Sequence, residues 1–251
     1  MIRDYKLNGF TAPILVPLTD ELDAVRRLIY QLTKDKLENH SDDLSLEDKL
    51  NINFRSIPSE SFWSKLMNTV NKSNELKTLI NCEKIKNTFK KIFKYPEIFS
   101  VSTFRARLPS QKRVVYDWHQ DEGTWYLSKN KEKLNKFPAT LWFSINGAKK
   151  NDSIQLIRGS HLKKLYNHDY INGQGFFKVK TKIDEKKIYT VEALPSQGVI
   201  FNSLIIHRSV PSNFINMRPR YSIDIRYYDK TKNQKIKTDF LFRLKKVFNM
   251  F

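Results

Sequence analysis

The run GVIFNSLIIH, residues 198–207, is almost wholly apolar and ends in a histidine. Five other short runs are also rich in β-branched and aromatic residues, and turn residues separate them. These runs are VSTFRARL (101–108), ATLWFSIN (139–146), SIQLI (153–157), IYTVEAL (188–194) and RYSIDIRYY (220–228). Closely spaced strands of this kind predict a mainly β fold, with a sandwich or barrel core over about residues 96–230.

Residues 1–95 have a helical pattern instead. Apolar residues recur at helical spacing after Asp20, over residues 59–70 and over residues 74–93. The polar segment 41–60 predicts a loop with at most one short helix. We therefore expect a helical cover that packs on the β core.

The end of the chain is basic and amphipathic. From Thr238 onward, apolar residues stand among Lys and Arg, which predicts an amphipathic helix over about residues 238–251. Such a helix could contact a membrane surface, but packing against the core is favoured. No linker or internal repeat divides the sequence. We expect one domain over residues 1–251.

Composition limits the class of protein. The chain has 251 residues and 40% apolar content, enough to enclose a core. It shows no signal peptide and no apolar run of the roughly 18 residues that a membrane span needs. Cys82 is the single cysteine, so an intrachain disulfide is excluded and a reducing, cytoplasmic location is favoured.

The formal net charge of +19 has two interpretations. It would suit a polyanionic partner such as nucleic acid, a membrane surface or a phosphorylated substrate. It would also follow from a lysine-rich composition spread over the whole surface. The basic residues are scattered with only mild clusters, which favours the second interpretation and leaves nucleic acid as an open partner.

The segment YDWHQDEGTWYL, residues 116–127, places His119 and Asp121 two positions apart. In an extended segment both side chains lie on one face and can share a metal ion. His207, at the end of the longest apolar run, is the candidate third ligand. Two imidazoles and one carboxylate leave three open positions, an arrangement typical of non-haem Fe(II) in oxygenases.

Iron with three open positions needs an electron source for O2 activation, and a chelating 2-oxo acid can supply it. Its distal carboxylate would require a fixed cation, and the fork of an arginine suits a carboxylate. Arg220 opens the run after His207, and Ser222 lies on the same face of that run. Arg218 is the alternative, although Pro219 draws it toward a loop.

Four motifs in this order resemble the phytanoyl-CoA dioxygenase (PhyH) family of Fe(II)/2-oxoglutarate oxygenases. They are WHQDEGTW (118–125), SIQLIRGSH (153–161), GVIFNSLIIHRSVPSN (198–213) and RPRYSIDIRY (218–227). The opening LNGFTAPILVPLTDELDAVRRL (7–28) is similar to the start of that family. The resemblance implies a double-stranded β-helix (jelly-roll, cupin-like) core with flanking helices. It also implies iron bound by His119, Asp121 and His207, and 2-oxoglutarate held by Arg220.

Some details depart from the family's usual pattern. The segment between the distal histidine and the arginine is two residues longer here, which keeps Arg218 open as the clamp. Arg158 replaces a turn proline, and the glycine often found before that turn is missing around residues 152–153. Position 121 is a carboxylate rather than Ala or Gly, which argues against the halogenating relatives.

Several other residues have a functional and a structural interpretation. Trp125 would line the cosubstrate pocket or belong to the core, and Thr140 would bond 2-oxoglutarate or only face the interior. Arg105 and Arg107 share one strand face, which we expect to be solvated rather than a second anion site.

The other histidines are expected to have no metal role. His161 stabilises a turn in the family motif, while His40 and His168 are expected on the surface. Asn213 is expected to fix its loop.

The resemblance implies a dioxygenase that uses O2 and 2-oxoglutarate and releases succinate and CO2. We expect hydroxylation of an unactivated C–H bond in a small polar or anionic metabolite, which would be carboxylated, phosphorylated or carrier-linked. Two alternatives remain. Arg220 and Arg226 form an RxxxxxR pattern similar to that of nucleic-acid alkyl-repair dioxygenases, and a non-catalytic relative would bind only an anion or a partner.

Overall fold

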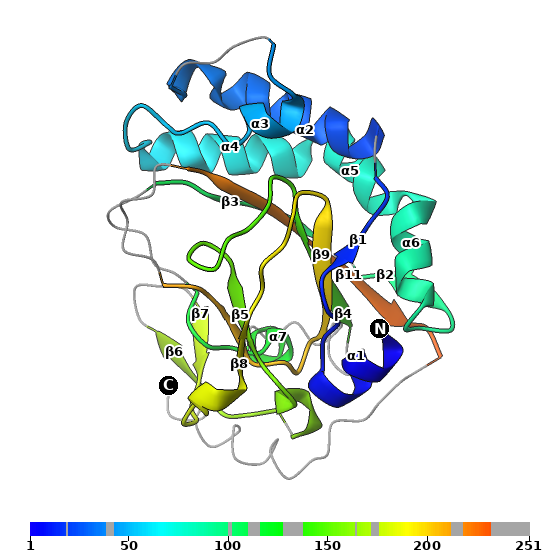
Figure 1. Cartoon of the computed structure of the whole chain (residues 1–251). Helices are drawn as coiled ribbons and strands as arrows, with labels where there is room; N and C mark the ends of the chain where they lie inside the picture. The colour runs from blue at the N-terminus through cyan, green and yellow to red at the C-terminus, as the bar shows by residue number, and fades with distance from the viewer. Residues whose placement is uncertain are drawn as a thin grey trace.

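The computed structural model describes residues 1–18, 20–38, 43–99, 102–109, 116–127, 138–163, 165–171, 176–211 and 218–231. Its strands form two antiparallel sheets and a separate hairpin (Figure 1). The larger sheet contains β1 (Ile14–Leu15), β9 (Gln197–Asn202), β4 (Ala139–Ser144), β11 (Arg220–Asp229), β2 (Pro96–Ile98) and β3 (Thr103–Arg107). The smaller sheet contains β10 (His207–Ser209), β5 (Ile154–Ile157) and β8 (Ile188–Thr190). The hairpin is β6 (His168–Ile171) with β7 (Phe176–Val179).

β11 organises the larger sheet. It pairs with β4 along one edge, and along the other edge its first half pairs with β3 and its end pairs with β2. Every residue of β4 is buried, which is expected for a strand covered on both faces. Because side chains alternate, Leu141 and Phe143 point to one face of the sheet, and Thr140 and Trp142 point to the other.

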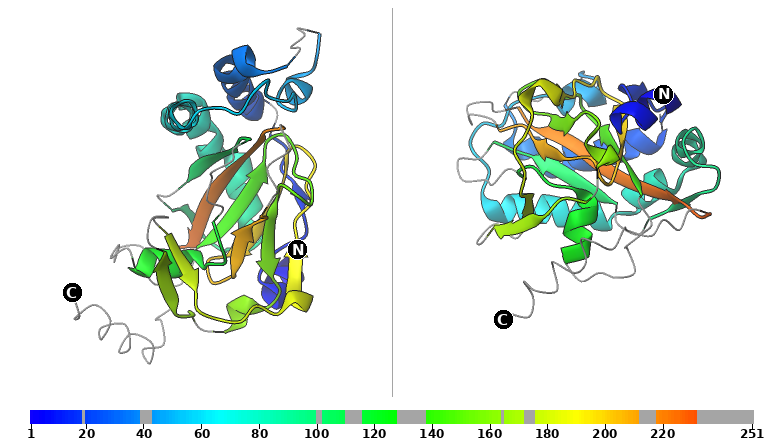
Figure 2. Two further views of the ribbon diagram at one scale, coloured as in Figure 1. Left: turned by 90° about the vertical axis from the view of Figure 1, so that its left-hand side faces the viewer. Right: turned by 90° about the horizontal axis from the view of Figure 1, so that it is seen from below.

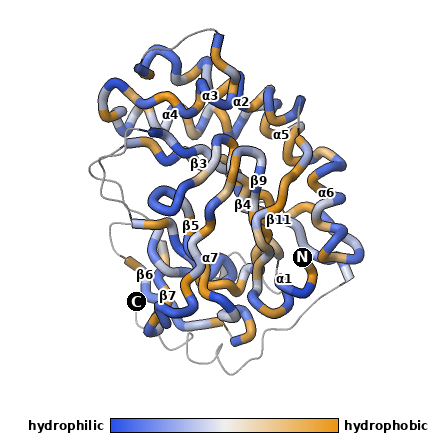
Figure 3. The backbone as a smooth tube through the Cα atoms, in the orientation of Figure 1, coloured by the Kyte–Doolittle hydropathy of each residue, from blue (hydrophilic) through white to orange (hydrophobic). Residues whose placement is uncertain are grey.

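Helices cover the outer face of the larger sheet (Figures 1 and 2). They are α2 (Asp20–Thr33), α3 (Leu46–Lys49), α4 (Glu60–Lys72), α5 (Asn74–Asn81) and α6 (Glu83–Lys90). Hydrophobic and hydrophilic residues alternate around α2 and α4, as expected for helices with one face on a core (Figure 3). Leu22 of α2, Leu66 of α4 and Phe143 of β4 belong to one buried cluster. This packing leaves the opposite face of the sheet for the interior of the fold.

The inner face of the larger sheet packs on the smaller sheet. Trp142 and Phe201 from the larger sheet share a buried cluster with Ile154 and Leu156 from the smaller one. α1 (Ile2–Asn8) lies beside β9, and α7 (Asp121–Leu127) contacts β7. Short 3-10 turns occur at Lys34–Lys36, Ser160–Leu162 and Glu185–Lys187. The mainly β core with flanking helices confirms the predicted fold class.

The segment after Asp20 and the segment 59–70 are helices as predicted, and α3 is a short helix within the described residues of the segment 41–60. The predicted helix over 74–93 is wrong in its continuity, because Cys82 has extended backbone angles that end α5 and begin α6. The predicted C-terminal helix lies outside the described residues. Within the described part of the chain, no helix is long and apolar enough to span a membrane.

The apolar run that ends in His207 is two strands rather than one. β9 ends at Asn202, a turn follows, and His207 is the first residue of β10 in the other sheet. The turn is held locally, because Leu204 donates its N–H to the Asn202 side chain and Ile205 donates to the Asn202 carbonyl. His207 therefore stands at the start of a strand, where the chain passes from one sheet to the other.

Candidate metal centre

His119, Asp121 and His207 converge in the interior between the two sheets. Each offers one ligand atom, and the three atoms lie within 4.8 Å of one another. The Asp121 Oδ1 atom is 3.9 Å from His119 Nε2 and 3.7 Å from His207 Nε2. Asp121 and His207 are buried, and His119 is partly buried. The three predicted ligands are thus brought together from two distant segments.

Backbone hydrogen bonds hold the two ligand segments side by side. His119 and His207 each donate their N–H to the other's carbonyl oxygen, both at 2.9 Å. Gln120 reinforces the pairing, because its side chain donates to the Leu204 carbonyl at 2.7 Å. Glu122 adds another link, because Ser203 donates its hydroxyl to Glu122 Oε2 at 3.1 Å. These contacts hold the segments that carry the two imidazoles in register with each other.

Carbonyl oxygens fix both imidazole rings. His119 Nδ1 lies 2.7 Å from the Asp117 oxygen, and His207 Nδ1 lies 3.0 Å from the Ile205 oxygen. A carbonyl oxygen only accepts, so each Nδ1 carries the proton and each Nε2 presents its lone pair to the centre. Burial, followed by the neighbouring His207, lowers the pKa of His119 to about 3, which keeps this ring neutral at physiological pH. The donor set therefore fits a divalent metal ion.

The carboxylate of Asp121 is held from its outer side. Its Oδ2 atom accepts hydrogen bonds from Thr140 Oγ1 at 3.1 Å, Arg226 Nη2 at 3.1 Å and Arg226 Nε at 3.2 Å. Burial alone would raise the pKa of Asp121, but Arg226 and the two imidazoles outweigh it and hold that pKa well below its usual value. The carboxylate is therefore ionised, and Oδ1 is directed toward the imidazoles.

Arg220 is buried in the interior on the same face of β11 as Arg226. Its Nε donates to the Asp152 carbonyl at 3.1 Å, and its Nη1 donates to the Ser222 hydroxyl. Burial, followed by the nearby Arg107, lowers the pKa of Arg220 to about 10. The Ser144 hydroxyl, opposite Ser222 on β4, is buried without a hydrogen-bond partner among the described residues. A buried guanidinium beside two hydroxyls fits the distal carboxylate of a 2-oxo acid.

Arg218 is placed differently from Arg220. It forms an ion pair with Asp152, at 2.7 Å from Nη1 to Oδ2, and also donates to the Asn51 side chain and the Asn146 carbonyl. These contacts tie it to the loops at the start of β11. Arg218 therefore already has a carboxylate partner, whereas Arg220, the other candidate clamp, points to the interior.

Arg105 and Arg107 share the interior face of β3, so the expected solvated strand face is only partly correct. Both residues are half-buried, and Arg107 pairs directly with Arg220 in the strand register. Arg105 Nε lies 3.1 Å from Asp224 Oδ2, and its guanidinium stacks over the Tyr116 ring at 5.0 Å. The ring centroid of Tyr116 is in turn 6.0 Å from that of His119. Arg105 therefore stands near the exposed side of the ligand cluster.

A family model matches most of this chain. The phytanoyl-CoA dioxygenase (PhyH) model aligns with residues 5–216, which include all three candidate ligands. The chain belongs to this family. As a PhyH-family protein it is a non-haem Fe(II)- and 2-oxoglutarate-dependent oxygenase, which confirms the recognition made from the four motifs.

Solved structures share the fold of this PhyH-family protein at low sequence identity. The apo form of the non-heme monooxygenase ThoJ is 15% identical, with a TM-score of 0.59 over 91% of this chain and 76% of its own. EvdO2 from Micromonospora carbonacea var. aurantiaca, complexed with 2-oxoglutarate, is 13% identical, with a TM-score of 0.57 over 94% and 92%. The epimerase SnoN, in complex with Fe3+, alpha ketoglutarate and nogalamycin RO, is 13% identical, with a TM-score of 0.58 over 92% and 82%. No protein of curated function matches in sequence.

The PhyH-family core uses His168 in a way that the sequence did not predict. His168 was expected on the surface, but it is buried, and its Nε2 accepts a hydrogen bond from the Gln120 N–H at 3.2 Å. Its Nδ1 lies 2.8 Å from the Tyr166 carbonyl, which fixes the tautomer. The ring also packs on Gly123, where an added Cβ would lie only 2.2 Å from it. His168 thus supports the segment that carries two ligands.

Five further residues were singled out in the sequence, and the structure describes the side chains of two of them. His161 Nε2 donates to the Lys6 carbonyl at 3.1 Å, consistent with a role in its turn. Trp125 belongs to α7, but its side chain lies outside the described part of the structure, as do His40 and Asn213. Thr140 faces the interior, where its hydroxyl bonds Asp121.

Sequence reasoning missed the supporting roles of Gln120, Asp224 and Arg226 at this PhyH-family centre. Gln120 stands between the two ligands, where only the fold shows that its amide joins two other loops. Alternation along β11 could have found Arg226, because residues 220, 222, 224 and 226 share one face of an extended strand.

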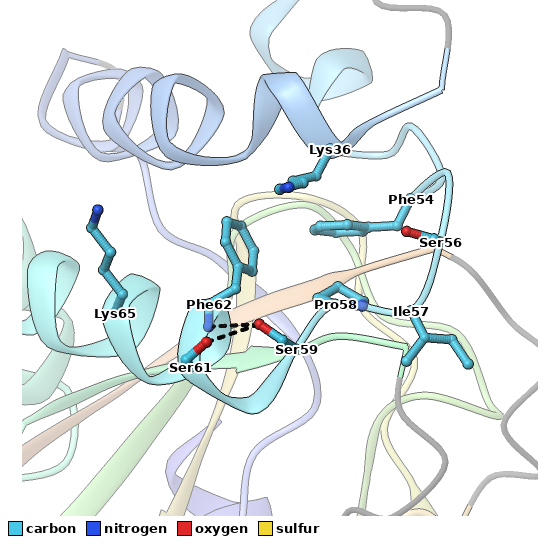
Figure 4. Close-up of a pocket in the computed structure, with 9 residues that line it drawn as sticks. All are labelled: Lys36, Phe54, Ser56, Ile57, Pro58, Ser59, Ser61, Phe62 and Lys65. Carbon is cyan, nitrogen blue, oxygen red and sulfur yellow. Dashed lines mark hydrogen bonds between the residues drawn. The ribbon is translucent and has the colours of Figure 1, made fainter.

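A separate cleft of about 360 Å³ lies in the helical layer, between the 3-10 turn at Lys34–Lys36 and the start of α4 (Figure 4). Phe54 and Phe62 line its apolar part, and Lys36 and Lys65 stand at its sides. None of its lining residues is a histidine or a carboxylate. The cleft therefore offers no ligand set comparable to that of His119, Asp121 and His207.

Proposed function

We propose that this enzyme hydroxylates an unactivated C–H bond of a small anionic metabolite, with iron held by His119, Asp121 and His207. The convergence of these three side chains carries the proposal. Bound iron and 2-oxoglutarate supply O2 activation and hydrogen abstraction, with succinate and CO2 as coproducts. The chain supplies the ligands, the orientation of the cosubstrate and a dry interior.

In this proposal Arg220 holds the distal carboxylate of 2-oxoglutarate. Its guanidinium is buried, lies 5.4 Å from the Trp142 ring and has hydroxyls of Ser222 and Ser144 nearby. A buried cation gains most from a carboxylate when water is excluded. Arg107, directly opposite Arg220, adds a second positive charge that favours an anion at this position.

The other residues of the interior keep the ligands in place and exclude water. The Phe201 ring packs at 4.8 Å from the His207 ring, which covers that imidazole with an apolar surface. Thr140 holds Asp121 rather than the cosubstrate in this assignment. Substrates would approach past Tyr116, which is 44% exposed and whose ring lies beside that of His119.

Arg105 supports the proposal of an anionic substrate. The Arg105 side chain is 37% exposed near the open side of the centre, and its carboxylate partner Asp224 also contacts Arg226. A carboxylate, a phosphate or a charged carrier group on the substrate would pair with the exposed part of the Arg105 side chain. The family match does not favour the nucleic-acid alternative, and the complete ligand set argues against a non-catalytic relative. A cytoplasmic location would suit the free thiol of Cys82.

Succinate release tests the proposal. Purified protein with Fe(II), ascorbate and 2-oxoglutarate should release succinate slowly alone and faster with an anionic substrate from a metabolite panel. His119→Ala should abolish both rates, while His161→Ala serves as the matched histidine control. The proposal would be refuted if the wild-type protein neither bound 2-oxoglutarate nor released succinate under any condition. Stimulation only by neutral metabolites would refute the anionic substrate.

A further inference from the structure

Four charged side chains form a continuous row from the open side of the centre to the candidate iron ligand. Arg105 Nε lies 3.1 Å from Asp224 Oδ2, and the same oxygen lies 3.6 Å from Arg226 Nη2. Arg226 then donates twice to Asp121 Oδ2, at 3.1 and 3.2 Å. The charges alternate along the row, and its inner members Asp121, Asp224 and Arg226 are buried. Asp224 therefore lies between two arginines, and Arg226 holds Asp121 at the inner end of the row.

We infer that Arg226 is a positioning residue that restricts Asp121 to metal ligation through one oxygen, Oδ1. This inference rests on the metal centre of the proposed function. A carboxylate can bind a metal ion with one oxygen or with both. Binding with both would fill one of the positions that 2-oxoglutarate and O2 require. Arg226 keeps Oδ2 of Asp121 occupied with hydrogen bonds.

The pairing of β11 with β4 accounts for this restriction. Arg226 on β11 and Thr140 on β4 are direct partners in the strand register, and both bond the same oxygen of Asp121. For Oδ2 to turn toward the imidazoles, it would have to leave three donors in a buried site. Hydrogen bonds to a buried charge are strong, and leaving the guanidinium unpaired would add a further cost.

Asp224 keeps Arg226 in this position. It lies two residues before Arg226 on the same face of β11, and it contacts Arg226 and Arg105 with one oxygen. Without Asp224, the guanidinium of Arg226 would lose its second carboxylate neighbour. The row therefore predicts how strongly each substitution lowers succinate release. Loss of Arg226 should have the largest effect, loss of Asp224 an intermediate one and loss of Arg105 the smallest.

A crystal structure with Ni(II) alone tests the inference in the wild-type protein. Ni(II) should bind His119, His207 and Asp121 Oδ1, with Arg226 still bonded to Oδ2. Coordination by both oxygens of Asp121, or displacement of Arg226, would overturn the inference while leaving the metal centre intact. Failure of Ni(II) to bind the three residues would overturn the metal centre as well.

Substitutions separate positioning from a purely structural role. In Arg226→Met, Asp121 should bind Ni(II) through both oxygens, and Ni(II) affinity measured by calorimetry should not fall. Succinate release should nevertheless fall by roughly 10- to 100-fold, as is typical for changes next to metal ligands. Arg226→Lys should restore one-oxygen binding and part of the activity, because it retains a donor.

Two controls complete the experiment. Arg218→Met removes a partly buried arginine that is also paired with an aspartate, and it should leave the coordination of Asp121 unchanged. Asp224→Asn should lower succinate release less than Arg226→Met does. If Arg226→Met keeps one-oxygen ligation, or loses affinity and activity in parallel, Arg226 has only a structural role.

Discussion

His119 and His207 are joined through their backbones as an isolated antiparallel bridge, with a hydrogen bond of 2.9 Å in each direction. His119 lies two residues before the start of α7, and His207 is the first residue of β10 in the smaller sheet. Because main-chain atoms make this bridge, it does not depend on either imidazole. The ligand side chains are therefore held next to each other, with their rings 4.2 Å apart, by the fold itself.

The loss of one imidazole should remove metal binding but not the fold. In His207→Ala the backbone bridge remains, so we expect a stability within about 2 kcal/mol of wild type. The Ni(II) affinity should fall by more than the roughly 10- to 100-fold typical of residues that only support a ligand. Calorimetry with Ni(II) and urea unfolding measure both quantities. An unchanged Ni(II) affinity would exclude His207 as a ligand.

Substitution of Arg220 should weaken cosubstrate binding selectively. Arg220→Lys keeps a positive charge but loses the fork that matches a carboxylate, so the Kd for 2-oxoglutarate should rise by about tenfold or more. The Ni(II) affinity should stay the same, because Arg220 does not contact the metal ligands. Arg218→Lys is the matched control. A larger effect on the Kd from Arg218 than from Arg220 would reverse the assignment of the clamp.

Gly123 should not tolerate a side chain. A Cβ at this position would lie 2.2 to 2.7 Å from three ring atoms of His168, so Gly123→Ala forces the buried ring to move. We expect a loss of about 1–3 kcal/mol in unfolding free energy, as for other overpacked cores. Adding His168→Ala to Gly123→Ala should cost less than the sum of the two single changes. Strict additivity in urea unfolding would contradict a direct clash.

His168 should make the metal-free protein sensitive to acid. Burial lowers its pKa to about 4 in the folded chain, against about 6.5 in the unfolded chain. Between these values the unfolded chain binds more protons. Neutral His168 therefore makes its full contribution to the free energy of unfolding above about pH 6.5. Between pH 6.5 and 4 this contribution falls by up to about 1.4 kcal/mol per pH unit.

The substitution His168→Phe isolates this contribution from that of other titrating groups. The variant should be less stable than wild type at pH 7, because Gln120 loses its acceptor. This difference should shrink as the pH falls from 6.5 to 4. Denaturant unfolding at several pH values gives the comparison. A difference that stays constant with pH would show that His168 is not buried in its neutral form.

The sequence was sufficient for the parts of the fold that depend on local patterns. Alternation and β-branched content predicted β4, β5 and β11, and helical spacing predicted α2 and α4. The run before His207 was misread because a tight turn held by the Asn202 side chain has no signal in the apolar pattern. α1, α7 and the hairpin of β6 and β7 were not predicted, since tertiary contacts rather than strong periodicity determine such short elements.

The three candidate ligands could be predicted from spacing and family motifs, but their support could not. Gln120, Asp224 and Arg226 act through partners that are distant in sequence, such as Leu204, and only the packed sheets bring these partners together. His168 was misplaced for the same reason, because the contact that buries it lies far along the chain.

Arg107 and Arg220 face each other on neighbouring strands, although like charges in direct register repel. A dianion that lies between the two arginines would relieve this repulsion in the folded chain. In the unfolded chain the two arginines are not held together, so the dianion would bind the folded chain preferentially. The cosubstrate would thereby act as a stabiliser as well as a reactant, protecting loaded enzyme from heat and proteolysis. The abundance of the enzyme in a cell would then follow the supply of the metabolite it consumes.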